Sequence, residues 1–288
     1  MNNEEEKNKV EKSTLYLVAT PIGNLADISY RAVKVLSEVD FIAAEDTRNT
    51  PVLLMRYGIK KPLVSYYEHN KRERGEYICE RLLSGESCAL VTDAGTPAIS
   101  DPGQDLVELC IQKNIKVTSI PGACAAITAL TLSGLNTRRF CFEGFLSTEK
   151  SEKQDRLAEL SREKRTVIIY EAPHKLKTTL DDLYRAFGDR RVSICRELTK
   201  INEEAILTTL SEACAYCAER RPRGEYVLVI EGAKEEETAF FADMTVKEHV
   251  SFYEKQGLSR MDAIKAAAKD RGVPKSALYA ELNKEGKK

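Results

Sequence analysis

Residues 15–24 read Leu15-Tyr16-Leu17-Val18-Ala19-Thr20-Pro21-Ile22-Gly23-Asn24, and this stretch decides the fold. Its first half is an apolar run typical of a β-strand, and Pro21 and Gly23 end that run in a turn. Asp27 is then predicted to open a helix, since apolar side chains follow with helical spacing at Ile28, Ala32, Val33, Leu36 and Val39. A strand that turns directly into an amphipathic helix is the first half of a βαβ unit, which favours a parallel sheet.

The same alternation continues to residue 135. We predict strands at residues 41–44, 88–92 and 116–120, and helices at residues 71–84, 102–113 and 122–132. A further short helix is expected between Thr50, as its N-cap followed by Pro51, and Gly58. Residues 14–135 are therefore predicted to form an α/β domain around a mainly parallel sheet.

A second α/β domain is predicted for residues 136–234. Its strands are expected at residues 140–145, 166–170, 191–195, 205–209 and 225–230, and its helices at residues 149–163, 174–187 and 211–220. The junction near residues 134–137 is short, which indicates that the two domains pack closely around a shared cleft. Residues 1–13 are predicted to be a disordered tail and residues 240–288 a helical segment.

The composition is that of a globular protein with no charge bias. Hydrophobic residues make up 42%, and 44 Lys and Arg against 45 Asp and Glu leave a net charge of −1, so no global field indicates a nucleic-acid binder. No apolar run approaches the ~20 residues that span a bilayer, and the tail does not resemble a signal peptide. We therefore expect a cytoplasmic protein without membrane contact.

The cysteines and histidines do not form a metal-binding pattern. Most of the eight cysteines lie in apolar stretches, where a thiol packs as a small hydrophobe, and the pair Cys214 and Cys217 has no second pair near it. The three histidines are spread over positions 69, 174 and 249. We expect reduced, structural thiols and no metal site.

Three loops rich in small residues follow predicted strands, at residues 19–24, 92–103 and 119–126. Small side chains allow a ligand to approach the backbone, and the carboxyl ends of parallel strands are where open α/β folds bind ligands. None of the loops reads G-x-G-x-x-G or as a P-loop, which argues against a dinucleotide or nucleotidase site. The three loops predict one binding site at one edge of the sheet.

Together with further motifs these loops resemble the tetrapyrrole methylase superfamily of S-adenosyl-L-methionine enzymes. The resemblance is closest to the branch that methylates ribose 2′-hydroxyls of small-subunit rRNA, and it covers about Leu15 to Leu282. The motifs that carry it are residues 15–25, Ala44-Glu45-Asp46-Thr47-Arg48, Glu68-His69-Asn70, residues 93–103, residues 170–176 and Arg196-Glu197-Leu198-Thr199-Lys200. Residues 94–97 differ from the Gly-Asp-Pro turn of many tetrapyrrole enzymes, which argues against a porphyrin-type substrate.

The resemblance implies that S-adenosyl-L-methionine binds between the two domains, largely through backbone. The cofactor-binding positions that it implies are Ile22, Gly23, Asp93, Ala94, Gly95, Thr96, Ile99, Cys124, Ala125, Glu171, Leu198 and, more weakly, Glu225. Asp93 is also a candidate base, although its place in the loop favours a role as a brace for its own turn.

The substrate that the resemblance implies is a decoding-region cytidine of 16S rRNA in the small ribosomal subunit. A ribose hydroxyl is a weak nucleophile and gains from a base or from nearby cations. Our candidates for handling it follow two successive strands, and they are Glu45, Asp46, Arg48, His69 and Asn70. The alternative is that these residues form a surface ion pair and carry a loop histidine.

The C-terminal segment and four basic clusters are the hints of RNA contact. Ser259-Arg260-Met261-Asp262 is predicted to be a capping box that opens a helix to residue 270, followed by a turn and a second helix at residues 276–282. Residues 244–288 hold ten Lys and Arg and six Asp and Glu. The clusters lie at residues 138–139, 162–165, 190–191 and 220–223. Two roles are open for the C-terminal segment. It either binds RNA or packs against the rest of the chain or against a second copy in a dimer.

Two other functions compete with rRNA methylation. One is a methylase of the same superfamily that acts on a small molecule or on a diphthamide precursor. The other is a non-catalytic rRNA-binding assembly factor that retains a degenerate cleft. A homodimer is expected from the resemblance in either enzymatic case.

Overall fold

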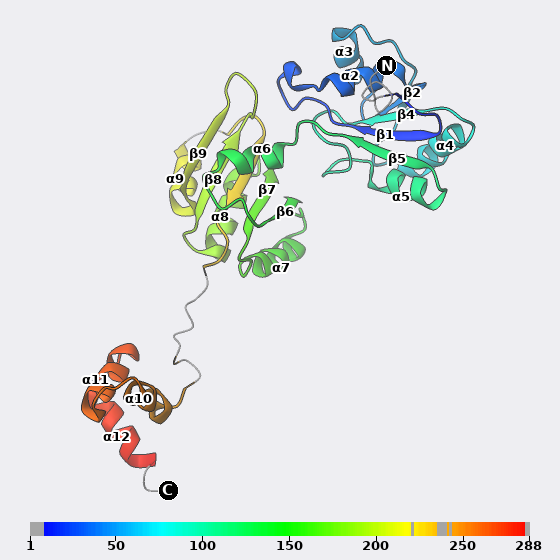
Figure 1. Ribbon diagram of the computed structural model, residues 1–288. Helices are drawn as coiled ribbons and strands as arrows, with labels where there is room; N and C mark the ends of the chain where they lie inside the picture. Colours follow the sequence, from blue (N-terminus) through cyan, green and yellow to red (C-terminus); the bar gives the residue numbers. More distant parts are fainter. Residues whose placement is uncertain (1–8, 220–221, 235–240, 242–243, 286–288) are drawn as a thin grey trace. The chain divides into compact units, whose positions relative to one another are not determined.

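The chain is described by a computed structural model that covers residues 9–219, 222–234, 241 and 244–285 (Figure 1). It divides into two compact units, Met1–Ala233 and Lys234–Lys288. Parts of three predicted features lie outside the described residues, namely residues 1–8 of the tail, Arg220 and Arg221 of one basic cluster, and residues 240, 242–243 and 286–288 of the helical segment.

The first sheet is wholly parallel, with strand order β3-β2-β4-β1-β5. Its strands are β1 (Thr14–Val18), β2 (Phe41–Ala44), β3 (Leu63–Ser65), β4 (Cys88–Val91) and β5 (Lys116–Ile120). Helices α2 (Tyr30–Glu38) and α3 (Thr50–Arg56) pack on one face, through Val35, Leu36 and Leu54. Helices α4 (Lys71–Leu83) and α5 (Gln104–Gln112) pack on the other, through Ile78, Leu82 and Leu106. The predicted parallel α/β architecture is confirmed.

Several helices begin later than the sequence predicts, and α3 begins one residue earlier. Asn24 caps a separate 3-10 turn, η1 (Leu25–Asp27), and Ser29 rather than Asp27 precedes α2, because its hydroxyl accepts the amide of Ala32 at 3.1 Å. Asn49 is the residue before α3, so Thr50 is its first helical residue. Helix α5 starts at Gln104 instead of residue 102, and α6 (Ala125–Leu132) starts three residues after Gly122 because Cys124 has an extended backbone.

The second sheet is mixed, with strand order β6-β7-β10-β8-β9. Its strands are β6 (Phe140–Phe145), β7 (Thr166–Glu171), β8 (Arg191–Arg196), β9 (Glu204–Thr209) and β10 (Tyr226–Ile230). Strand β6 runs parallel to β7, whereas β10 is antiparallel to both β7 and β8, and β9 is antiparallel to β8. Residues 197–203 are too few for a helical crossover, and a short connection gives an antiparallel pair.

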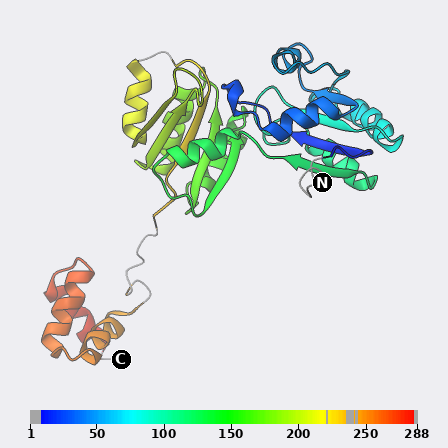
Figure 2. The same cartoon turned by 45° about the horizontal axis from the view of Figure 1, so that its top comes forward.

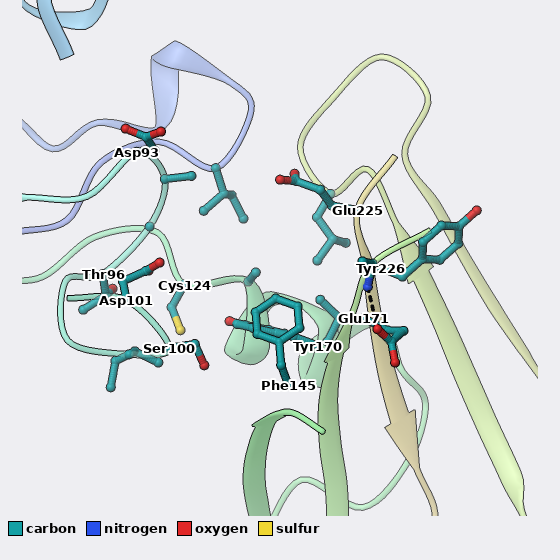
Figure 3. A pocket seen from close by; sticks show the side chains of 18 of the residues that line it. Asp93, Thr96, Ser100, Asp101, Cys124, Phe145, Tyr170, Glu171, Glu225 and Tyr226 are labelled. Atoms are coloured by element: carbon teal, nitrogen blue, oxygen red, sulfur yellow. Dashed lines mark hydrogen bonds between the residues drawn. The ribbon is translucent and has the colours of Figure 1, made fainter. Parts of the chain in front are cut away.

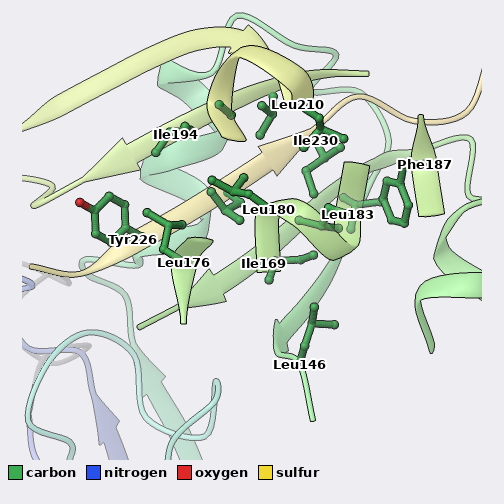
Figure 4. Close-up of a cluster of buried hydrophobic side chains, with 14 of the residues drawn as sticks. Leu146, Ile169, Leu176, Leu180, Leu183, Phe187, Ile194, Leu210, Tyr226 and Ile230 are labelled. Carbon is green, nitrogen blue, oxygen red and sulfur yellow. The ribbon is translucent and has the colours of Figure 1, made fainter. Parts of the chain in front are cut away.

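Helices cover both faces of the second sheet, and one of them precedes the sheet in the chain. Helices α7 (Lys150–Leu160), α8 (Leu176–Phe187) and α9 (Leu210–Glu219) enclose the large core of Figure 4. Helix α6, which follows β5 of the first sheet, packs on the opposite face against β7 and β10 (Figure 2). Along β7 the side chains alternate, with Ile169 in the large core and Ile168 against α6. The first-sheet segment thus supplies one layer of the second-sheet core.

The C-terminal unit is a bundle of three helices. Helices α10 (Val246–Lys255), α11 (Arg260–Asp270) and α12 (Lys275–Glu285) share a core that includes Val250, Ile264 and Leu278. A complete capping box precedes α10 at Thr245 and Glu248, where the sequence predicts none. At Ser259 only one half forms, since its hydroxyl accepts the amide of Asp262.

Among the described residues, no helix is both long and apolar enough to span a bilayer.

A buried histidine makes the stability of the C-terminal unit depend on pH. His249 is fully buried, its Nδ1 accepts Nε of Arg271 at 3.1 Å, and its Nε2 lies 3.2 Å from Asp270 Oδ2. Because Nδ1 accepts, Nε2 carries the proton of the neutral ring. Burial lowers the pKa of His249 despite the neighbouring carboxylate.

We predict that this unit loses stability as pH falls. A lowered folded-state pKa means that below about pH 6.5 the unfolded chain binds more protons than the folded one, so the loss reaches at most about 1.4 kcal/mol per pH unit. Hydrogen exchange of the backbone amides in α10 and α11 of the full chain, corrected for the intrinsic exchange rates at each pH, measures this loss of stability. His249→Gln should remove that part of the dependence. Equal protection at pH 7.5 and pH 5.5 would contradict the prediction.

Candidate active site

A pocket of about 400 Å³ lies between the ends of the two sheets (Figure 3). That volume is in the range of sites that bind small molecules. The residues that line it are Ile22, Glu45, Asp93, Ala94, Gly95, Thr96, Ile99, Ser100, Asp101, Cys124, Ala125, Phe145, Tyr170, Glu171, Ala172, Pro173, Leu198, Glu225, Tyr226 and Val227.

The first sheet contributes the loops at the carboxyl ends of its strands. Ile22 follows β1, Glu45 follows β2, residues 93–101 follow β4 and Cys124 follows β5. Because these strands are parallel, all four loops meet at one edge of the sheet. The two central loops are also bonded to each other, since the backbones of Thr20 and Gly95 exchange two hydrogen bonds.

The second sheet faces the same space with the ends of four strands. Phe145 ends β6, Tyr170 and Glu171 end β7, Leu198 follows β8, and Tyr226 begins β10. Strand β10 presents its amino end because it runs antiparallel to β7 and β8. The mixed topology thus places strand ends of both directions at one edge.

Two close contacts join the sheets on either side of the pocket. The amide of Asn24 donates to Thr199 Oγ1 at 3.1 Å, and a Cβ on Gly23 would lie 2.5 Å from Lys200 Cγ and 2.9 Å from Thr199 Oγ1. On the other side, a Cβ on Gly144 would lie 2.9 Å from Ser100 Oγ. Gly144 has φ +70° within an irregular stretch of β6. Both approaches therefore require glycine.

Backbone strain is concentrated in two loops of this site. Six described residues other than glycine have positive φ, and four of them are Ala98, Ser100, Glu197 and Thr199. Each such residue costs on the order of 1–3 kcal/mol, so the surrounding structure must impose the conformation. Strain of this kind is typical of functional sites.

Acidic side chains gather on the first-sheet side of the pocket. Glu45 Oε2 accepts the amide of Asp93 at 3.4 Å, and Asp93 accepts Nδ2 of Asn49 at 2.9 Å. Burial raises the pKa of Glu45, and the charges of Asp93 and Asp46 raise it further. Burial, with the charges of Glu45 and Asp93, raises the pKa of Asp101 to about 7. A cation is favoured in this part of the pocket.

Aromatic rings line the opposite side. Tyr170 packs edge-on against Phe142 and Phe145, with ring centroids 4.9 and 5.6 Å apart. Its hydroxyl oxygen accepts the amide of Ala126 at 3.0 Å, and burial raises its pKa. The ring is therefore held in place by the first turn of α6, while Phe145 is 58% exposed and free to meet a planar ligand.

A short series of hydrogen bonds fixes the carboxylate of Glu171. Its Oε2 accepts Oγ1 of Thr179 at 2.5 Å, and its Oε1 accepts the amide of Ala172 at 2.8 Å (Figure 3). Thr179 Oγ1 in turn accepts Nζ of Lys153 at 3.2 Å, and Lys153 pairs with Asp182 at 2.8 Å. These contacts fix the end of β7 and the rim residues Ala172 and Pro173.

Every residue that was predicted to bind the cofactor, except Gly23, lines the pocket. The eleven others, Ile22, Asp93, Ala94, Gly95, Thr96, Ile99, Cys124, Ala125, Glu171, Leu198 and Glu225, all line it. Gly23 lies beside it, against residues 198–200. Their role in binding stays a prediction.

Of the five predicted substrate-handling residues, only Glu45 lines the pocket. Arg48 folds back onto Asp46 through both side-chain and backbone bonds, which lowers the pKa of Asp46 to about 2. Asn70 instead braces its own turn, accepting the amide of Tyr67 and donating to Ser65. His69 is exposed after β3, the edge strand, with β2 between β3 and β4. The structure therefore does not bring Asp46, Arg48, His69 and Asn70 to the pocket.

Several lining residues were not singled out from the sequence. Five of them lie within motifs that carry the family resemblance, although the sequence alone gives them no individual role, and these are Ser100, Asp101, Tyr170, Ala172 and Pro173. Phe145, Tyr226 and Val227 stand in strands and read as core. Only their position at strand ends brings them to the pocket.

Within the described parts of the chain, no group of three or more His, Cys, Asp or Glu side chains is arranged to hold a metal ion.

The chain matches the family model of tetrapyrrole (corrin/porphyrin) methylases over residues 14–214. A protein named ribosomal RNA small subunit methyltransferase I from Halalkalibacterium halodurans is 49% identical over 272 residues, 93% of this chain and 94% of that protein. The protein of that name from Bacillus subtilis is 47% identical over 275 residues, 94% of each chain. Among solved structures, uroporphyrin-III C-methyl transferase from Thermus thermophilus, complexed with S-adenyl homocysteine, has a TM-score of 0.54 at 17% identity, covering 75% of this chain and 96% of that one.

The fold is that of a two-sheet α/β methylase. The chain belongs to the tetrapyrrole methylase family and, within it, to the group of ribosomal RNA small subunit methyltransferase I proteins. The predicted family and fold class are confirmed.

We predict that Thr179→Val destabilises the chain. The substitution removes the hydroxyl that donates to buried Glu171 and leaves that carboxylate with its backbone partner alone, at a cost of about 1–3 kcal/mol. Urea unfolding followed by circular dichroism measures the change. Thr131→Val, on the exposed side of α6, is the matched control and should lie within about 0.5 kcal/mol of wild type. Equal unfolding midpoints for both variants would refute the importance of this bond.

Proposed function

We propose that the chain transfers a methyl group from S-adenosyl-L-methionine to the ribose 2′-hydroxyl of a decoding-region cytidine in 16S rRNA of the small subunit, in the cytoplasm. The observation that carries the proposal is the pocket at the facing ends of the two sheets, with carboxylates on one side and aromatic rings on the other. Membership of the methylase family supports the reaction, and the names of the close relatives support the substrate.

The chemistry of the pocket suits this methyl donor. A sulfonium cation gains from nearby carboxylates and carbonyl oxygens, and Glu45 and Asp93 provide the former. The amides of the loops after β4 and β5 suit the carboxylate of the donor's amino-acid group, because their small residues leave the backbone accessible. Tyr170 and Phe145 offer surfaces against which a flat ring can stack.

The protein's contribution to such a reaction is mainly positioning. Methyl transfer is an in-line displacement at carbon, so the attacking oxygen must lie opposite the departing sulfur. Loops held by the contacts at Gly23 and Gly144 keep the two sides of the pocket at a fixed separation.

The first experiment is isothermal titration with S-adenosyl-L-methionine, with NADH and ATP as controls, followed by methylation of 30S subunits that lack ribose methylation. We expect selective donor binding and a single 2′-O-methylcytidine in the decoding region, located by mass spectrometry. A methyl group on a base would overturn the ribose assignment. A folded chain that binds no donor would overturn the enzyme assignment and favour an rRNA-binding assembly factor.

A pocket-filling variant tests the place of binding. Ala125 lines the pocket at the start of α6, and Ala125→Leu adds three carbon atoms there. Overpacking costs about 1–3 kcal/mol, so donor affinity should fall roughly tenfold or more. Thr131→Leu, exposed on the same helix, should bind as wild type. Unchanged affinity for Ala125→Leu would place the donor elsewhere.

We also propose that the chain acts as a homodimer. Large apolar side chains on the first-sheet helices are left in solvent, with Tyr30 98%, Val52 66% and Met55 73% exposed. Exposed apolar side chains of this size are typical of protein contacts. Sedimentation equilibrium decides whether the mass is that of one 32.3 kDa chain or of two.

A further inference from the structure

One carboxyl of the pocket differs from the others in having no partner. Asp101 lies in the strained loop between β4 and α5, directly after Ser100 with φ +63°, and its side chain lines the pocket (Figure 3). Its carboxyl makes no hydrogen bond or ion pair with any residue that the structure describes. Both of its oxygens are therefore available to a ligand.

Every other carboxylate that lines the pocket is already engaged. Glu45 accepts the amide of Asp93, and Asp93 accepts Asn49. Glu171 accepts Thr179 at 2.5 Å, and Glu225 pairs with Lys200 at 2.8 Å. Each of these bonds engages an oxygen of its carboxylate, so among the described residues Asp101 is the pocket carboxyl without a protein partner.

We propose that Asp101 is the general base of the methyl transfer and accepts the proton of the attacking hydroxyl. The inference rests on the proposed function and assigns a residue to its chemical step. The sequence does not single out Asp101 for this role, because Asp101 stands between Ser100 and Pro102 and Asp93 is the aspartate of this loop that reads as a candidate base.

The proposed step is balanced. The 2′-O–H bond breaks and its proton passes to the Asp101 carboxylate, while an oxygen lone pair forms the new bond to the methyl carbon. The carbon–sulfur bond breaks with its electron pair going to sulfur, so the positively charged sulfonium becomes a neutral thioether. Asp101 then returns its proton to water.

The groups around Asp101 suit a proton acceptor at neutral pH. Glu45 and Asp93 face it from the loops after β2 and β4, and Tyr170 and Cys124 line the pocket from β7 and from the start of α6. None of these groups is cationic. Burial and the two carboxylates raise the pKa of Asp101 to about 7, near the value at which a base is most effective in the cell.

The test is single-turnover methylation of unmethylated 30S subunits at saturating donor, with donor affinity measured separately. For Asp101→Asn we expect retained donor binding and a rate about 10²–10⁴-fold lower. Asp101→Glu should recover part of the rate. Asp105→Asn is the matched control, since Asp105 lies on the neighbouring helix α5 and pairs with Lys71 at 2.7 Å outside the pocket.

The wild-type pH profile is a second measurement that needs no variant. Its rate should rise about tenfold per pH unit up to about pH 7 and then level off, because only the ionised carboxyl accepts a proton. Asp101→Asn should lack this limb. A wild-type rate independent of pH between 5.5 and 8 would overturn the proposal.

Stability separates a base from a structural residue. A folded-state pKa above that of the unfolded chain means that ionisation of Asp101 opposes folding as pH rises from about 4 through about 7. Asp101→Asn should therefore melt at a higher temperature than wild type at pH 8, and the difference should shrink towards pH 4. A lower melting temperature at pH 8 would assign Asp101 a structural role instead.

The outcomes distinguish this proposal from the one on which it rests. A wild-type chain that neither binds the donor nor methylates rRNA overturns the proposed function. A wild-type chain that methylates, with Asp101→Asn equally fast, overturns only the role of Asp101. Loss of donor binding in Asp101→Asn with an unchanged rate at saturation would make Asp101 a donor contact rather than the base.

Discussion

The packing of α6 on the second sheet is the constraint on which the site depends. The helix follows the last strand of the first sheet, yet Ala126, Ala129 and Leu130 are buried against Ile168, Val227 and neighbouring strand residues. Two α/β units joined by a flexible connection would be free to turn relative to each other. Here the first unit's own helix is a layer of the second unit's core, so the strand ends of the two sheets must face one another. The ends of α6 and β7 are further joined by the bond between Ala126 and Tyr170.

That constraint explains why the pocket tolerates strain and like charges. Ala98, Ser100, Glu197 and Thr199 hold left-handed backbone conformations. The charge of Asp93 contributes to the raised pKa of Glu45, and the charges of Glu45 and Asp93 contribute to the raised pKa of Asp101. Neither arrangement favours folding by itself. Both are maintained because two large cores, on either side of the pocket, stabilise the elements that carry the loops. The strained and acidic groups are concentrated where ligand chemistry would use them.

The first sheet and the loops that line the pocket were predictable from the sequence. Loops of small residues directly after apolar strands are typical of the carboxyl ends of a parallel sheet. The differences between the predicted and the observed lining of the pocket have local causes. Arg48 turns back onto Asp46, and such a bond within three residues competes with any role in a pocket. His69 follows the edge strand, and strand order is not readable from one sequence. Phe145 and Tyr226 look like ordinary strand residues, and Asp101 looks like one more turn residue, until the fold places them around a common space.

The position of α6 also has a consequence for synthesis of the chain. All five strands of the first sheet have been made once residue 120 has emerged, but the partners of α6 are complete only at Ile230. At about 5–20 residues per second, the apolar segment Ala125–Leu132 waits roughly 5–20 s without its docking surface. During that interval the ribosome carries a folded sheet followed by an uncovered hydrophobic helix, which is the kind of segment that nascent-chain chaperones bind.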